Sequence, residues 1–131
     1  MNPGLLTYLL VALGGALGSM ARQWSGVMAA RYWGVAFPWG TLAINVLGSL
    51  VIGAFAALTD VNGRWPMSGF ARQFVMVGIC GGYTTFSSFS LQTLTLMSDG
   101  LWLEAGLNIM LSVALCLVSV ALGHFLAMQL N

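Results

Sequence analysis

Four long apolar segments, separated only by short polar connections, constrain the fold of this chain more than any other feature. A helix needs about 20 mostly apolar residues to cross the hydrocarbon core of a bilayer. Four segments meet that requirement, over residues 4–30, 38–58, 68–97 and 101–128. The connections leave no room for a soluble domain. We therefore predict an all-α membrane protein with four transmembrane helices, forming a single transmembrane domain over residues 1–131.

The composition supports this prediction and excludes several classes of function. Only 5% of the residues are charged, whereas a soluble domain carries about 25%, so the lipid bilayer must cover most of the surface. Four scattered arginines and no lysine make no basic patch, which argues against a nucleic-acid partner. Cys80 and Cys116 lie inside apolar runs and match no metal-binding spacing. We find no arrangement of residues that suits an enzyme's nucleophile or acid–base pair.

The arginines do not choose an orientation in the membrane. Arg22 and Arg31 lie on or near the first connection, and Arg64 and Arg72 lie on or near the second. Arginines in short loops favour the cytoplasmic side, and here the two sides nearly cancel. Two interpretations remain open at this point, either chance in a small sample or a protein that inserts in both orientations.

Glycines and polar side chains recur at helical spacing within the apolar segments. Gly14 with Gly18, and Gly78 with Gly82, form small-xxx-small patterns that predict close helix contacts. Two helices carry polar stripes on one face, consisting of Thr41, Asn45 and Ser49 in the second and of Asn108, Ser112 and Ser119 in the fourth. Ordinary hydrogen bonding between helices would explain most of the hydroxyls. Asn45 needs more partners than its own helix offers.

The third segment contains the strongest functional signal. The pair Gly81 and Gly82 is followed by β-branched Thr84 and Thr85, which predicts a break in the helix. A break at membrane depth frees backbone carbonyls, and such backbone must be buried in protein, line a cavity or bind an ion. Freed carbonyls attract a hard cation. The alternative is an unbroken, serine-rich packing helix.

Aromatic and hydroxyl side chains follow the predicted break. Phe86 and Phe89 share one face, and Thr85 and Ser88 form the adjacent stripe. Phenyl ring edges are electropositive, so edges beside hydroxyl and amide donors suit a small anion, although two phenylalanines at this spacing also occur in plain packing. No acidic or basic side chain able to relay protons lies in the middle of a predicted span.

Three motifs of this chain, in order, resemble the Fluc/CrcB family of bacterial fluoride channels. They span residues 14–22, 40–49 and 81–90, and the resemblance covers essentially the whole chain. The resemblance implies an antiparallel, dual-topology homodimer in the bacterial inner membrane that passively exports fluoride ion through two pores. It would also account for the balanced arginines.

The resemblance also assigns roles to individual residues. The pore and fluoride path would be lined by Asn45, Phe86, Phe89, Thr41, Ser88 and Ser112. The backbone carbonyls of Gly81 and Thr84 would bind a central, structural sodium ion (Na+) shared by both copies. Arg22 would either attract anions at a vestibule or extend to the membrane interface. Gln92 stands where many members carry a glutamate; the loss of that carboxylate would alter the rate or gating and leaves the core of Asn45, Phe86 and Phe89 intact.

Two other functions remain as alternatives. A small multidrug-type antiporter has the same length and number of spans, but it requires a carboxylate within the membrane, which this chain lacks. A non-transporting partner protein that packs in a larger complex would suit the glycine-rich helices. It would leave the hydroxyl cluster and Asn45 without a purpose.

Overall fold

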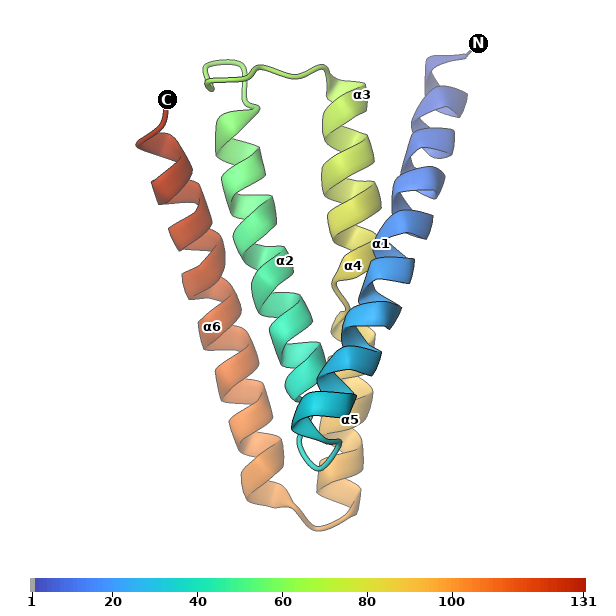
Figure 1. The fold of residues 1–131 in the computed structure, drawn as a ribbon, viewed down its shortest axis with the longest axis vertical. Helices are drawn as coiled ribbons and strands as arrows, with labels where there is room; N and C mark the ends of the chain where they lie inside the picture. Colours follow the sequence, from blue (N-terminus) through green and yellow to red (C-terminus); the bar gives the residue numbers. More distant parts are fainter. Residues whose placement is uncertain (1) are drawn as a thin grey trace.

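The computed structural model describes residues 2–131 and contains helices joined by short connections (Figure 1). The elements are α1 (Pro3–Trp33), α2 (Trp39–Leu58), α3 (Gly69–Arg72), a π-helical stretch η1 (Gln73–Cys80), α4 (Gly81–Tyr83), α5 (Phe86–Ser98) and α6 (Trp102–Met128). Because α3, η1, α4 and α5 follow one another along a single span, these elements make four membrane-length helices. The predicted all-helical architecture is therefore confirmed.

Local sequence explains where the helices begin and end. Asn2 accepts a hydrogen bond from the Gly4 N–H at 2.9 Å and Pro3 occupies the first turn, a favourable start for a helix. Gly34 ends α1 with a positive φ of 76°. Gly100 makes the turn between α5 and α6 with a φ of 77°, a conformation that glycine adopts without strain.

The third span is interrupted, as the sequence predicts. Helix α4 ends at Tyr83, and Thr84 and Thr85 are extended, with φ and ψ of −81° and 159° and of −154° and 112° respectively. The break falls after the glycine pair, because Gly81 and Gly82 are still helical. The π-helical stretch upstream of the break was not predicted.

Helix α1 crosses the half of the third span that precedes the break, and there the backbones of the two helices are in contact. A Cβ atom on Gly14 would meet the Phe74 carbonyl oxygen and would lie 2.9 Å from the Gly78 Cα, and a Cβ on Gly82 would lie 2.6 Å from the Gly15 carbonyl oxygen. These approaches confirm the close contacts predicted from the small-xxx-small patterns.

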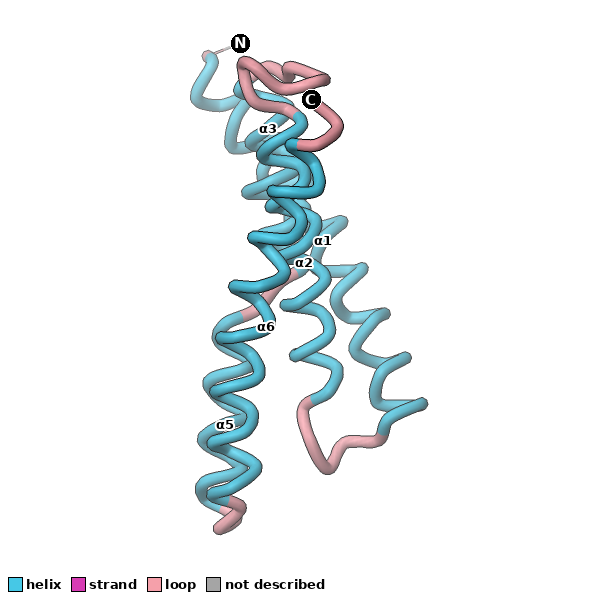
Figure 2. The backbone as a smooth tube through the Cα atoms, turned by 90° about the vertical axis from the view of Figure 1, so that its left-hand side faces the viewer, coloured by secondary structure: helices cyan, strands magenta, loops and turns pink. Residues whose placement is uncertain are grey.

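Beyond the break the molecule divides into two arms. Figure 2 shows α5 and α6 running together in one arm, while the end of α1 and the start of α2 form the other. Both chain termini and the connection 59–68 lie at the opposite end of the molecule (Figure 1). Polar side chains from both arms line a cavity that lies between them.

Candidate ion pathway

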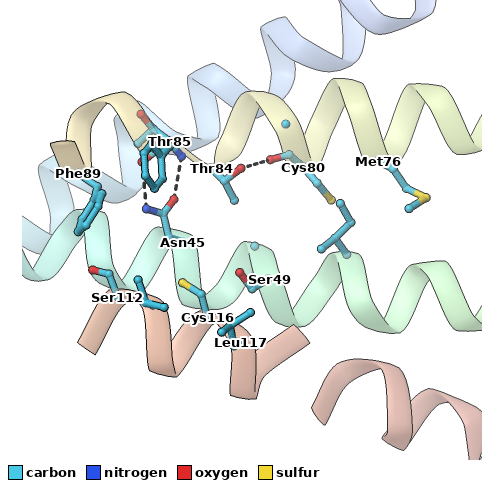
Figure 3. A pocket seen from close by; sticks show the side chains of 15 residues that line it. Asn45, Ser49, Met76, Cys80, Thr84, Thr85, Phe89, Ser112, Cys116 and Leu117 are labelled. Carbon is cyan, nitrogen blue, oxygen red and sulfur yellow. Dashed lines mark hydrogen bonds between the residues drawn. The ribbon is translucent and has the colours of Figure 1, made fainter. Parts of the chain in front are cut away.

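The two backbone residues at the break are held by side chains from α1 and α2. Asn45 Oδ1 accepts a hydrogen bond from the Thr85 N–H at 2.7 Å, and Asn45 Nδ2 donates to the Thr85 carbonyl oxygen at 3.0 Å (Figure 3). Arg22 Nη1 donates to the Thr84 carbonyl oxygen at 3.2 Å. Unpaired backbone groups are costly in a membrane, so these contacts stabilise the break.

Thr85 also starts the helix that follows the break. Its Oγ1 accepts a hydrogen bond from the Ser88 N–H at 3.2 Å, as an N-cap residue does, and it donates to Ser88 Oγ at 3.0 Å. Thr84 Oγ1 donates back to the Cys80 carbonyl at 2.9 Å. The hydroxyl of Thr84 therefore satisfies a carbonyl near the end of α4, and the hydroxyl of Thr85 caps the start of α5.

The Gly81 carbonyl is among those that lose their helical partner at the break. In a regular helix the N–H of Thr85 would donate to the Gly81 carbonyl oxygen. Here that N–H donates to Asn45 instead. Gly81 is exposed on the chain surface, and a Cβ there would have only the Met76 carbonyl oxygen nearby, at 3.8 Å.

Two cavities meet at the break. The first, which we call the apolar cavity, has a volume of about 400 Å³ and lies between α2, the third span and α6 (Figure 3). Of the predicted site residues it is lined by Asn45, Gly81, Thr84, Phe86, Phe89 and Ser112. The second, the polar cavity, has a volume of about 800 Å³ and lies between the two arms. Of the predicted site residues it is lined by Arg22, Thr41 and Ser88.

The structure thus divides the predicted pore residues between two cavities, and Thr85 lines both. Thr85 is 8% exposed and forms the wall where the cavities adjoin. The sequence placed Thr85 only in a stripe beside the phenylalanines. Its position between the cavities was missed because it depends on which side of the break each neighbouring helix packs.

The two phenylalanines are neighbours with different surroundings. Their ring centroids are 5.2 Å apart and their planes are inclined by 51°. Phe89 is 8% exposed, whereas Phe86 is 77% exposed in the single chain. An open aromatic ring beside a cavity is a surface that a second polypeptide chain or lipid must cover.

The polar cavity also contains residues that the sequence did not assign to a path. Gln23, Ser87 and Gln92 line it. Among the side chains of residues 2–131, the buried oxygen and nitrogen atoms all have hydrogen-bond partners except Gln92 Oε1. Gln92 therefore lines this cavity while its side-chain oxygen is buried without a hydrogen-bond partner. Its departure from the family's glutamate was the signal that pointed to it.

The similarity to known proteins extends over this whole arrangement. A family model described as CrcB-like protein, Camphor Resistance (CrcB), matches residues 9–124. A protein of Rhodospirillum rubrum is 59% identical over 96% of this chain and 98% of its own length, and one of Paramagnetospirillum magneticum is 58% identical over 97% and 99%. A third, of Opitutus terrae, is 55% identical over 95% and 94%. Each of the three carries the name fluoride-specific ion channel FluC. With a family model matching most of its length and relatives of this similarity, the chain belongs to the CrcB-like family.

Proposed function

We propose that this chain forms a fluoride-selective channel of the bacterial inner membrane, through which fluoride leaves the cytoplasm passively, lowering its toxicity. The observation that carries the proposal is the break at Thr84 and Thr85, where two donor-lined cavities meet. It occurs in a chain more than half identical to proteins named fluoride-specific ion channels.

The chemistry of the two cavities suits a small, strongly hydrated anion. In the polar cavity, Arg22, Thr41 and Ser88 supply a positive charge and hydroxyl donors that can begin to replace water. In the apolar cavity, the Asn45 amide, the Ser112 hydroxyl and the ring edges of Phe86 and Phe89 replace the rest. Asn45 Nδ2 has two N–H groups, and only one donates to Thr85.

A second copy of the chain completes the path in this proposal, in antiparallel orientation. Phe86 is 77% exposed in one chain, and a pore needs walls on all sides. Arg22 and Arg31 lie in the second half of α1, and Arg64 and Arg72 lie in the connection 59–68 and in α3. The end of α1 lies toward one end of the molecule, and α3 with this connection lies toward the other (Figure 1). Equal charge at both ends supports insertion in both orientations, which an antiparallel dimer requires.

The same dimer would bind a structural sodium ion between the two copies. Hard cations prefer oxygen ligands. Gly81 is an exposed residue, and its carbonyl has lost the Thr85 N–H that a continuous helix would supply. Thr84 would contribute its carbonyl through the acceptor position that Arg22 leaves free. We expect dimers to be more thermally stable in sodium than in potassium or an organic cation. Equal stability in all three would remove sodium from the proposal.

The two alternatives are less well supported. A proton-coupled antiporter needs a carboxylate in mid-membrane, whereas Asp60, Asp99 and Glu104 lie in a connection, in a turn and in the first turn of α6. A non-transporting partner protein would have no use for two cavities that adjoin at a broken helix. It would purify with a larger complex and conduct no ion alone.

The direct test is ion efflux from liposomes that contain the purified protein. We expect rapid fluoride release, read with a fluoride electrode, and little chloride release in a matched experiment. Liposomes without protein provide the baseline. Failure of folded, dimeric protein to release either ion would contradict the proposed function, and equal release of both would contradict selectivity.

Orientation can be tested with two exposed loop positions. Val35 and Val61 are 85% and 84% exposed and lie in the connections at opposite ends of the molecule. Each is changed to cysteine in a background without Cys80 and Cys116, and intact spheroplasts receive a membrane-impermeant thiol reagent. Dual topology predicts partial labelling at both positions. Full labelling at one and none at the other would establish a single orientation.

A further inference from the structure

We propose that Asn108 is a positioning residue for ion passage, which draws the hydroxyl hydrogen of Ser112 away from the apolar cavity and so weakens fluoride binding there. This inference rests on the proposed function. It assigns a role to a residue that touches neither cavity.

Asn108 is the most deeply buried large side chain of the described chain, with 1% of its surface exposed. It lies on α6 against α5, and neither the apolar nor the polar cavity is lined by it. Its amide makes two hydrogen bonds. Asn108 Nδ2 donates to Thr93 Oγ1 at 2.9 Å, and Asn108 Oδ1 accepts from Ser112 Oγ at 3.4 Å.

The direction of these bonds follows from Thr93. The single hydroxyl hydrogen of Thr93 donates to the Phe89 carbonyl oxygen at 2.8 Å. Thr93 can therefore only accept from Asn108, which turns the amide nitrogen toward Thr93 and the amide oxygen toward Ser112. Ser112 must then be the donor in its bond with Asn108.

This chain of bonds links two residues of the proposed pore. Phe89 stands at one end and Ser112 at the other, and both line the apolar cavity. While Ser112 donates its hydroxyl hydrogen to Asn108, only its oxygen lone pairs remain available to the cavity. An anion cannot bind to lone pairs and needs the hydrogen. Fluoride must therefore compete with Asn108 for one hydrogen.

In this competition for the Ser112 hydrogen, the anion is modestly favoured over Asn108. At 3.4 Å the bond between Ser112 and Asn108 is longer than the usual 2.5–3.0 Å of a bond between oxygens. A hydrogen bond to an anion is about twice as strong as one between neutral groups. An arriving ion can take the hydrogen, and Asn108 takes it back when the ion leaves. A conducting site needs binding that is weak enough for release.

The experiment measures single-channel fluoride current in planar bilayers as a function of fluoride concentration. Asn108→Leu has a similar volume and removes the competing acceptor. We expect the half-saturating fluoride concentration to fall about two- to ten-fold, the range that one net hydrogen bond corresponds to. In a Ser112→Ala background, Asn108→Leu should leave the half-saturating concentration unchanged, because the hydroxyl is gone.

A purely structural role for Asn108 gives a different result. It would shift the half-saturating concentration equally in both backgrounds, or leave it unchanged in both, and either outcome overturns the inference. Ser119→Ala is the matched control, because it removes a hydroxyl from α6 that lines neither cavity. The wild-type channel is recorded first. An absence of fluoride current there counts against the proposed function itself.

A second variant covers the case in which Asn108→Leu does not fold. Thr93→Val keeps Asn108 but removes the acceptor that fixes its orientation. The amide can then turn its nitrogen toward Ser112 and release the hydroxyl hydrogen. We expect a change of the same sign, again lost in the Ser112→Ala background, and a persisting change there would overturn the inference.

Discussion

The two halves of the third span are held in the membrane by different kinds of contact. Before the break, η1 and α4 lie against the backbone of α1, with glycines at the contact. After the break, α5 is joined to α6 through the side chains of Thr93 and Asn108. The first half has no room for a Cβ atom at its glycine contacts with α1, and the second is joined to α6 by polar side chains.

The difference separates a fixed part of the molecule from an adaptable one. Backbone atoms in contact cannot rotate to make new partners, so the glycine contacts hold the break in one place. Hydroxyls can exchange a partner within the protein for a passing ion, because a hydrogen atom on oxygen rotates easily, whereas an amide must turn its whole planar group. A channel needs both properties, since its hydrogen-bond donors must be held in position and must also release the ion.

The largest effect is expected where the glycine contact is filled. A Cβ on Gly18 would meet the Ile79 carbonyl oxygen and lie 2.8 Å from the Tyr83 nitrogen. We expect Gly18→Ala to destabilise the fold by about 1–3 kcal/mol, as overpacking does, and to reduce the yield of dimeric protein in detergent. Gly15→Ala is the control, because a Cβ there has no atom within 4 Å. Equal yield and equal melting temperature for the two variants would show that α1 can move away.

The largest effect on ion passage, as distinct from protein yield, is expected where Asn45 bonds to both backbone groups of Thr85 at the break. Asn45→Leu leaves the N–H and the carbonyl of Thr85 without the partners they have now. Each lost partner of a buried group costs about 1–3 kcal/mol, so we expect fluoride efflux to fall at least about ten-fold. Ser49→Ala, one turn away on the same cavity, should retain most of the efflux. Wild-type efflux in Asn45→Leu would mean that the backbone at Thr84 and Thr85 keeps its conformation without the hydrogen bonds from Asn45.

Much of this comparison was visible in the sequence. The apolar runs predicted the four spans, because only an all-helical backbone satisfies its polar groups in lipid at that length. Gly14 and Gly18 predicted the close contact, and Gly81 to Thr85 predicted the break. Each of these depends on residues near one another in the chain.

What the sequence did not reveal depends on residues that are far apart. Asn45 was predicted as a pore amide, and its two hydrogen bonds with Thr85 became known only from the packing of α2 against the break. The link from Asn108 to Thr93 joins positions 15 residues apart on antiparallel helices. The π-helical stretch left no signal that we recognised. The fluoride and sodium roles of individual residues stay predictions.

A smaller effect is expected from the positive charge at the polar cavity. Arg22 both lines this cavity and donates to the Thr84 carbonyl, so it has a structural and an electrostatic reason to matter. We expect Arg22→Gln to slow fluoride efflux several-fold at low ionic strength. If attraction dominates, the difference should shrink as impermeant salt is added, because charges are screened beyond about 10 Å at 0.1 M. A loss that is independent of salt would assign Arg22 to holding the break alone. Arg31→Gln, on an exposed position of α1, is the control.

The smallest effect is expected at the end of the molecule remote from the polar cavity. Arg64 donates to the Leu130 carbonyl at 2.7 Å, and its backbone N–H donates to Asn131 Oδ1 at 2.7 Å, so the connection 59–68 is fastened to the end of α6. These groups are exposed, and we expect Arg64→Gln to cost less than about 1 kcal/mol in thermal unfolding. Fluoride efflux should be unchanged, because this residue touches neither cavity. A marked loss of efflux in Arg64→Gln, with the protein still dimeric, would mean that this connection influences the ion path. The separation of the molecule into a fixed part and an adaptable part that carries the ion would then be wrong.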